Sequence, residues 1–320
     1  MNIVVTGSIA FDYLMSFPGN FSEHFLPDKL DRISVSFLVD SMKKRNGGVG
    51  ANIAYNLALL GERPFLFSVV GKDFGSYRDD LERAGIDVSG IRECSEEYTA
   101  SCFVSTDRSE NQIVSFYTGA MRFAKDFSLK DLNLKETDLV LVSPNDPEAI
   151  KKYAAECREM SVPYIFDPGQ QTVCLTGEEL LDGADGAEMF ILNEYELEMF
   201  RNKTGLDEEA VQGLAEIFVV TLGKRGSEIR TRQGTVHIPA VGPDRVLDPT
   251  GVGDAYRAGL VKGMAHHLSW ETAGRMGSLA AAYVLETDGP QSHAYDLEMF
   301  VARYCSVFGE SKEMRRLVTG

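Results

Sequence analysis

Basic residues are scarce in this sequence relative to acidic ones. The 320 residues include 32 Lys and Arg against 48 Asp and Glu, which gives a net charge of −16. Nucleic acids and anionic membranes are bound through basic surfaces, so this balance argues against both as partners. A small anionic ligand remains compatible with it, because one local positive site can outweigh a distant field.

Long apolar segments and paired cysteines are also absent. No run reaches the roughly 18 apolar residues that a membrane-spanning helix needs. The opening MNIVVTGSIAFDYLM has no basic segment before its apolar one, so we do not expect a signal peptide. The cysteines are odd in number and form no CxxC pair, which favours reduced thiols and a cytoplasmic protein. They are Cys94, Cys102, Cys157, Cys174 and Cys305.

Short apolar runs and helical patterns follow one another through most of the chain. The runs end in polar residues or glycine, and they cover residues 2–8, 64–73, 138–144, 163–169, 189–196 and 217–226. Amphipathic segments such as 147–160 lie between them. This alternation predicts a mostly parallel sheet with helices on both faces. Right-handed crossovers then gather the carboxyl ends of the strands at one edge, where α/β proteins bind ligands.

Two regions, 12–45 and 98–118, interrupt this alternation. Both read as strands with polar turns and contain no crossover helix. We expect them to form a small antiparallel sheet that stands off the main one and acts as a lid, inserted into one domain spanning residues 1–320. The alternative is that they continue the central sheet. Their rough polar–apolar alternation favours the small sheet, because half-exposed antiparallel strands alternate in this way.

The segment DPTGVGDAYRAGL (248–260) places an acid where a glycine-rich turn becomes a helix. We expect Val246 and Leu247 to end a strand before it. The amides of Gly251, Val252 and Gly253 would point from the helix start, an arrangement that binds anions. Phosphoryl transfer needs such a cradle beside a base for the attacking hydroxyl, and Asp254 would be that base. The alternative is a plain turn whose Asp interacts with the helix dipole.

Four motifs in order resemble those of the ribokinase-like (PfkB) kinase family. DPTGVGD (248–254) is similar to its C-terminal signature, and NGGVGANIAYNLALLG (46–61) to its N-terminal one. NEYE (193–196) resembles the N-x-x-E motif, and TLGKRG (221–226) the T-L-G-x-x-G nucleotide loop. Linked motifs are far more specific than one glycine-rich turn, and these cover essentially the whole chain. No Walker A sequence, GxxxxGK[ST], occurs.

The resemblance implies a three-layer α/β/α sandwich with a small β lid, and an ATP-dependent kinase that uses Mg²⁺. Within the family the chain looks most like bacterial and archaeal nucleoside kinases of the adenosine type, through segments such as ISVSFLV, ENQIVSFYTGAM and FDPGQ. A sugar kinase of the ribokinase or fructokinase kind is the alternative, and a member that binds nucleoside without catalysis is another. Lids in this family often pair, so a monomer and a lid-mediated homodimer both stay open.

The resemblance also implies a nucleoside site. Asp12 matches the aspartate that binds two neighbouring ribose hydroxyls, which suits a carboxylate acceptor. Asn52 matches the asparagine on a ribose hydroxyl, and Gly47 with Gly48 would let the sugar approach the backbone. Two further residues, Gln112 and Gln170, could read the nucleobase because an amide both donates and accepts; the alternative is that they are ordinary surface glutamines.

The phosphate side of the site is implied in the same way. Asn193 and Glu196 match the pair that holds Mg²⁺ through water, and oxygen ligands with retained water suit that ion. Without the resemblance we would take Glu196 as a solvated helix residue and Asn193 as a helix cap. Thr221, Gly223 and Gly226 match the loop that lines the ATP phosphates and ribose.

Four residues correspond to a pair of loops that binds K⁺ in many members of the family. They are Asp248, Thr250, Gly289 and Ser292. The resemblance therefore implies activation by a monovalent cation.

Two positions depart from the family pattern. Val49 stands where ribokinases commonly have a lysine, which argues against ribokinase itself. Arg257 stands where many members have a small or aromatic residue, one helical turn after Asp254. Helical spacing puts Arg257 on the face of Asp254, so it would either contact a phosphate or pair with that carboxylate.

Overall fold

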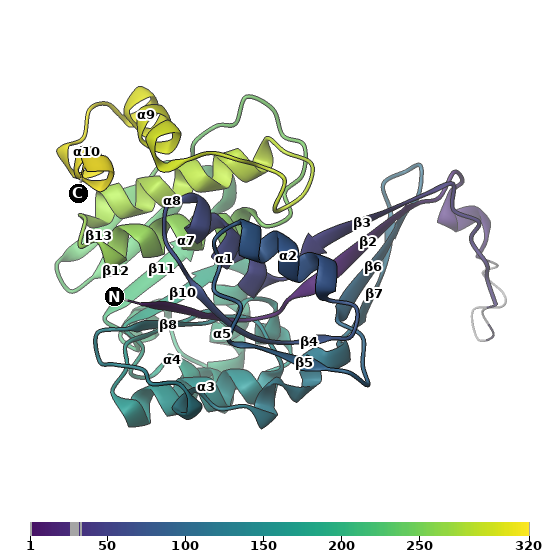
Figure 1. Cartoon of the computed structure of the whole chain (residues 1–320), viewed down its shortest axis with the longest axis horizontal. Helices are drawn as coiled ribbons and strands as arrows, with labels where there is room; N and C mark the ends of the chain where they lie inside the picture. The colour runs from purple at the N-terminus through teal and green to yellow at the C-terminus, as the bar shows by residue number, and fades with distance from the viewer. Residues whose placement is uncertain (1, 26–31, 33, 320) are drawn as a thin grey trace.

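A nine-stranded sheet forms the centre of the computed structural model, which describes residues 2–25, 32 and 34–319 (Figure 1). Its strand order is β13-β12-β11-β10-β9-β8-β1-β4-β5. The strands are β1 (Ile3–Thr6), β4 (Phe65–Gly71), β5 (Ile91–Cys94), β8 (Leu139–Val142), β9 (Tyr164–Phe166), β10 (Met189–Asn193), β11 (Ile217–Thr221), β12 (Ser227–Thr231) and β13 (Gly234–Ile238). All neighbours from β5 to β11 are parallel, and β12 and β13 add an antiparallel edge. The predicted mostly parallel sheet is confirmed.

Helices cover both faces of this sheet, as the near-continuous apolar strands predict. Val5 packs into the core on one face, whereas its neighbour Val4 packs into the core on the other. The first face carries α1 (Val49–Leu59), α2 (Gly75–Arg83), α7 (Val252–Ala265) and α8 (Trp270–Leu285). The second carries α3 (Pro147–Met160), α4 (Gly177–Ala184), α5 (Glu194–Thr204) and α6 (Glu208–Gln212). Finally, α9 (Leu297–Phe308) and α10 (Lys312–Thr319) pack outside α8.

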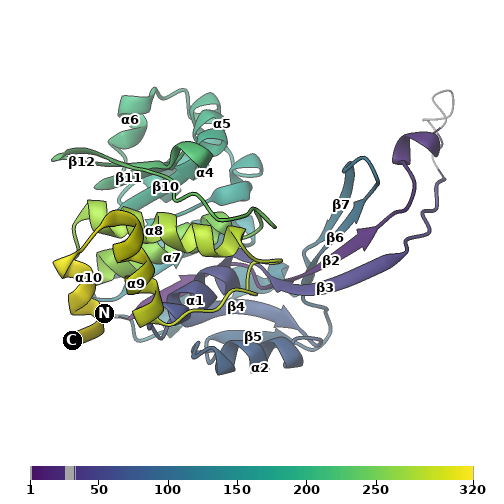
Figure 2. The same cartoon turned by 90° about the horizontal axis from the view of Figure 1, so that it is seen from above.

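A second sheet projects from one end of the main one (Figures 1 and 2). It consists of β3 (Ser41–Gly47), β2 (Ala10–Ser16), β6 (Ala100–Thr106) and β7 (Gln112–Tyr117), in that order. Residues 26–31 and 33 of the expected lid region lie outside the described residues.

The second sheet is mixed rather than antiparallel throughout, which corrects the expectation from the sequence. β2 and β6 pair in parallel, while β3 and β7 pair antiparallel on either side. The reason is topological: β2 follows β1 and β6 follows β5, so both leave the same edge of the main sheet in the same direction.

The packing of α7 against α8 fixes the helix that carries the predicted catalytic acid. Residues 255–263 of α7 are buried. At Gly259 a Cβ would lie 2.6 Å from the backbone carbon and oxygen of Met276 in α8, so the two backbones approach as closely as only glycine allows. Within the described residues, no helix is both long enough and apolar enough to span a membrane.

We predict that Gly259→Ala destabilises the fold. The added methyl group has no space beside Met276, and overpacking of this kind typically costs about 1–3 kcal/mol. Urea unfolding followed by circular dichroism measures the change. The matched control is Gly75→Ala in α2, where a Cβ meets nothing within 4 Å; that variant should be as stable as wild type or more so. Equal midpoints for the two variants would contradict the close contact between α7 and α8.

Candidate active site

Polar residues gather where the strands of the main sheet end. Asn193 closes β10 and Thr221 closes β11, and the two are register partners. Asp167 follows directly after β9, and the start of α7 brings Asp254 to the same edge. The parallel topology therefore assembles these groups, because it places every strand's carboxyl end on one side.

Asp254 is held by α1. The amide nitrogen Nδ2 of Asn52 donates to Oδ2 of Asp254 at 2.8 Å, and Asn52 is itself buried. Burial raises the pKa of Asp254 to about 6, and it outweighs the hydrogen bond from Asn52 and the charge of Arg257, which both lower the pKa. A carboxylate in this state can accept a proton near neutral pH.

Arg257 pairs with Asp167 and not with Asp254. Its Nη2 donates to Oδ1 of Asp167 at 2.7 Å, its Nε contacts the other oxygen, and its Nη1 donates to the carbonyl of Gly253 at 3.1 Å. Both partners are buried, with 8% and 2% of their surface exposed. The pair leaves Asp254 free for other contacts, because the bidentate bond directs the guanidinium to Asp167.

The glycine turn has the form that an anion cradle requires. Gly251 caps α7 with φ +80°, and a Cβ there would lie 2.5 Å from Cβ of Pro290. The amide of Val252 reaches the carbonyl of Pro249 only at 3.4 Å. Within the described part of the chain, the amides of Gly251 and Gly253 carry no intramolecular bond. They are therefore open to an anionic ligand.

The second sheet contributes Asp12, with two glycines beside it. Burial raises the pKa of Asp12 to about 6, against the charge of Arg45, which lowers it. A Cβ on Gly47 would lie 2.5 Å from Oδ2 of Asp12, so glycine keeps the carboxylate accessible. Gly48 begins α1 with φ +94°, and a Cβ there would meet the backbone of Ala10 at 2.6 Å.

Of the two predicted base-reading glutamines, Gln112 lies away from Asp12 in the second sheet. In the register of the second sheet, Asp12 is level with Cys102 and Phe116, whereas Gln112 is level with Ser16. Four residues along a strand correspond to about 13 Å. Gln170 is exposed in the short helix after β9. Phe116, half of whose surface is exposed, is therefore the aromatic side chain in the same row as Asp12, with Cys102 between them, and sequence reasoning missed it.

A cavity of about 630 Å³ adjoins the glycine turn. Its lining includes four residues assigned to the nucleotide and one from the turn, namely Asn193, Thr221, Gly223, Gly226 and Gly253. Apolar side chains such as Val241, Val246 and Leu285 form other walls. Val246 and Leu247 belong to no strand, contrary to expectation, and both are exposed. The reason is that this segment has no neighbouring strand to pair with.

Asn193 and Glu196 form a reciprocal helix cap. The Asn193 side chain accepts from the amide of Glu196 at 2.8 Å, and Oε2 of Glu196 accepts from the amide of Asn193 at 2.8 Å. Burial raises the pKa of Glu196. The cap uses Oε2, so Oε1 can accept from water on a hydrated Mg²⁺, and the residues fit that ion.

Asp248, one of the four residues assigned to K⁺, has an arginine as its partner in the structure. Asp248 Oδ1 accepts from the amide of Thr250 at 2.8 Å, and Oδ2 accepts from Nη1 of Arg45 at 2.6 Å. Ser292 donates to the carbonyl of Asp288 at 3.0 Å. A K⁺ ion on Asp248 would lie against the Arg45 guanidinium, and two unit charges about 4 Å apart repel by about 4 kcal/mol near a protein surface. The donor set does not fit a monovalent cation.

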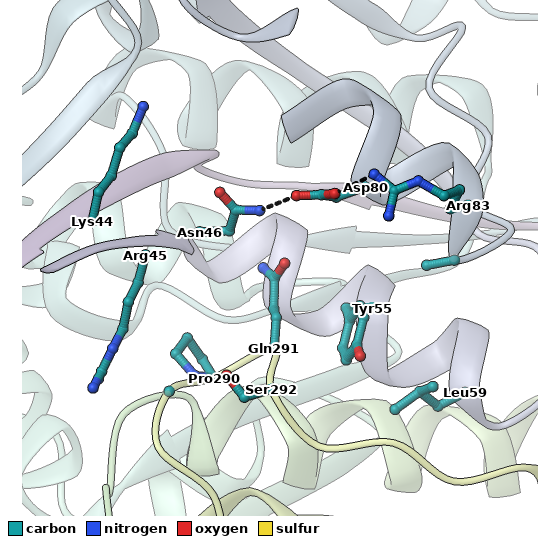
Figure 3. Close-up of a pocket in the computed structure, with 12 residues that line it drawn as sticks. Lys44, Arg45, Asn46, Tyr55, Leu59, Asp80, Arg83, Pro290, Gln291 and Ser292 are labelled. Carbon is teal, nitrogen blue, oxygen red and sulfur yellow. Dashed lines mark hydrogen bonds and ion pairs between the residues drawn. The ribbon is translucent and has the colours of Figure 1, made fainter. Parts of the chain in front are cut away.

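Sequence reasoning also missed a hydrogen-bond relay behind Asn52. Nε2 of Gln291 donates to Oδ1 of Asn52 at 2.8 Å and contacts the Tyr77 hydroxyl at 2.6 Å, and that hydroxyl donates to the carbonyl of Gly47 at 2.9 Å. Gln291 lies in the wall of a second cavity of about 660 Å³ (Figure 3). The relay fixes the orientation of the Asn52 amide, so that its nitrogen faces Asp254.

Residues 11–296 match the pfkB family carbohydrate kinase family, and the chain belongs to it. The resemblance read from the four motifs is confirmed. The chain is thus a phosphotransferase of a family that acts on hydroxyl groups, with the ribokinase-like fold.

Full-length relatives are named nucleoside kinases. One from Methanothermobacter thermautotrophicus is 30% identical over 96% of this chain and 97% of its own. The solved nucleoside kinase of Burkholderia thailandensis in complex with inosine is 35% identical, with a TM-score of 0.86 over 96% of this chain and 98% of that one. The nucleoside kinase of Methanocaldococcus jannaschii, described as an archaeal member of the ribokinase family, has a TM-score of 0.86 at 28% identity, covering 95% and 98%.

We predict that Arg257→Met destabilises the protein by about 3–5 kcal/mol, because it leaves the buried Asp167 charge unpaired. Urea unfolding measures the loss. The double variant Arg257→Met/Asp167→Leu should recover much of it, since both charges are then removed. As a control, Arg225→Met breaks an exposed pair with Glu194 and should unfold like wild type. A single variant as stable as wild type would show that the buried pair is not formed.

Proposed function

We propose that the protein transfers the γ-phosphoryl group of ATP to the 5′-hydroxyl of a nucleoside of the adenosine or inosine type. The carrying observation is the environment of Asp254: its carboxylate is buried, it accepts from Asn52 of α1 at 2.8 Å, and it follows directly after the glycine turn that caps α7. The similarity to nucleoside kinases, one of them solved in complex with inosine, supports the nucleoside as acceptor.

In this proposal Asp12 binds the two neighbouring ribose hydroxyls, and Asn52 offers its second amide hydrogen to the sugar. These hydrogen bonds orient the ribose so that its 5′-hydroxyl faces Asp254. The raised pKa of Asp254 suits this carboxylate to take the hydroxyl proton as the 5′-oxygen attacks the γ-phosphorus. The amides of Gly251 and Gly253 stabilise charge on the transferring phosphoryl group. The nucleobase would lie against Phe116.

ATP would occupy the 630 Å³ cavity, with its base on the apolar wall and its phosphates toward Gly253. Asn193 and Glu196 would hold Mg²⁺ through water, and that ion would neutralise charge on the phosphates. We assign K⁺ no role in this reaction, because Arg45 already places a positive charge on Asp248. The second sheet would close over the nucleoside and exclude water. Whether the protein acts as a monomer or as a homodimer through this sheet stays a prediction, as does a cytoplasmic location.

The substrate class can be tested with a panel of acceptors. We expect ADP formation with adenosine or inosine to exceed that with cytidine, because a purine has the larger ring to stack against an aromatic side chain. Formation with ribose or fructose should be smaller still, because a free sugar has no base. A coupled ADP assay gives kcat/KM, and ³¹P NMR identifies the 5′-phosphate. Turnover of a free sugar without nucleoside turnover would establish the sugar-kinase alternative. Nucleoside binding without ADP formation would establish an inactive binding protein.

The role of Asp254 has a pH signature. Asp254 must be ionised to act as a base, so kcat should fall as the pH drops through about 6, and protonation of Asp12 should raise the nucleoside KM in the same range. Asp254→Asn should reduce kcat by at least ~10²-fold at neutral pH and remove the acid limb of kcat. Asp126 is an exposed acid on the second face of the main sheet, and Asp126→Asn is the control. This variant should retain the wild-type kcat and the acid limb of its pH profile. An Asp254→Asn rate within a few-fold of wild type would exclude Asp254 as the base.

A further inference from the structure

Arg45 connects the second sheet to both loops that flank the glycine turn. It lies on β3, and only 16% of its side chain is exposed. Its Nη1 donates to Asp248 at 2.6 Å, and its Nη2 donates to Asp288. In Figure 3, Arg45 and Lys44 leave β3 in opposite directions, and Arg45 points to the side where the loop with Pro290 and Ser292 lies.

The two carboxylates lie on separate loops. Asp248 precedes the turn, and its other oxygen accepts from the amide of Thr250, one residue before Gly251. Asp288 follows α8, next to Gly289, which has φ +112°. A Cβ on Gly289 would lie 3.2 Å from Cδ of Arg45, so the arginine side chain packs against this loop. The guanidinium thus lies where the resemblance places a monovalent cation shared by the same loops.

The local charges require a cation at this point. Asp248 and Asp288 both face the guanidinium, and Asp12 is the register partner of Arg45 across β2 and β3. Arg45 therefore pairs with two carboxylates, and its charge also lowers the pKa of a third, that of Asp12, against the effect of burial. A planar guanidinium has several donors and can bind two carboxylates at once, which a lysine ammonium does less well.

We propose that Arg45 is a positioning residue that takes the place of a monovalent cation between the Asp248 and Asp288 loops, so that the enzyme needs no K⁺. Arg45 touches no reacting group. It acts through Asp248 on the glycine turn, and through β3 it joins that turn to the sheet that would cover the nucleoside. Both effects follow because one side chain on β3 binds two loops that are distant from it in the sequence.

This proposal rests on the proposed kinase activity, and the experiment distinguishes a failure of that activity from a failure of the role proposed for Arg45. The rate of ADP formation with inosine is measured in KCl, NaCl and tetramethylammonium chloride at equal ionic strength. We expect wild type to react equally fast in all three salts. No inosine turnover in any salt would contradict the proposed function. If turnover is several-fold faster in KCl than in tetramethylammonium chloride, the role proposed for Arg45 is overturned, whereas the proposed kinase function stands.

Variants of β3 test the side chain itself. Arg45→Ala should lower kcat/KM by ~10-fold or more in tetramethylammonium chloride, since the turn loses its anchor, and K⁺ or added guanidinium ion should restore part of it. Arg45→Lys keeps the charge, so its kcat/KM in tetramethylammonium chloride should lie between that of wild type and that of Arg45→Ala. The matched control is Lys43→Ala: Lys43 lies on the same strand, contacts Asp288 at 3.3 Å but not Asp248, and should behave as wild type.

Thermal unfolding provides a readout that does not depend on catalysis. K⁺ should leave the Tm of wild type unchanged and raise that of Arg45→Ala, because binding to the folded state alone stabilises it. If Arg45→Ala fails to fold, the wild-type salt comparison and Arg45→Lys still decide the question. An Arg45→Ala enzyme that is fully active without K⁺ would overturn the proposal, and so would a wild-type Tm that rises specifically with K⁺.

Discussion

The hydrogen bond between Asn52 and Asp254 is the contact on which the active site depends. It joins α1 to α7, two helices on the same face of the main sheet, and it sets where the carboxylate points. Gln291 holds the Asn52 amide from the other side, so a donor and not an acceptor faces the acid. Because the acid is buried by this packing, its pKa is raised to about 6, which suits the proton transfer that we propose.

Two arginines balance the acidic groups around this contact, and each does so at a different layer of the molecule. Arg257 neutralises Asp167 inside the core, beneath the glycine turn. Arg45 neutralises Asp248 at the edge, between the turn and the second sheet. Two of the acids near the turn, Asp167 and Asp248, are thus paired, which lessens the local negative charge in a chain with a net charge of −16.

In the proposed function, the two sheets contribute different groups to ligand binding. The main sheet and its helices supply the fixed parts: the amides of the turn, the Asn193–Glu196 cap and the apolar nucleotide cavity. The second sheet supplies Asp12 and Phe116 on strands that leave the main sheet together. The registers of β2 with β6 and of β6 with β7 together align these two residues, since a one-residue shift in either would turn one of them to the opposite face.

Patterns in the sequence were enough to predict the fold class, the family and most of the local structure. Apolar runs of strand length require two covered faces, and linked glycine and acid motifs are too specific to arise from turns alone. Those patterns did not predict that Arg257 binds Asp167 or that Arg45 binds Asp248. Nor did they predict that Phe116, and not Gln112, is level with Asp12 in the second sheet. Helical spacing made Asp254 as good a partner for Arg257 as any other acid. These pairings became clear only from the folded structure. They depend on which strand ends and loops meet in space, and neither spacing nor composition encodes those distances.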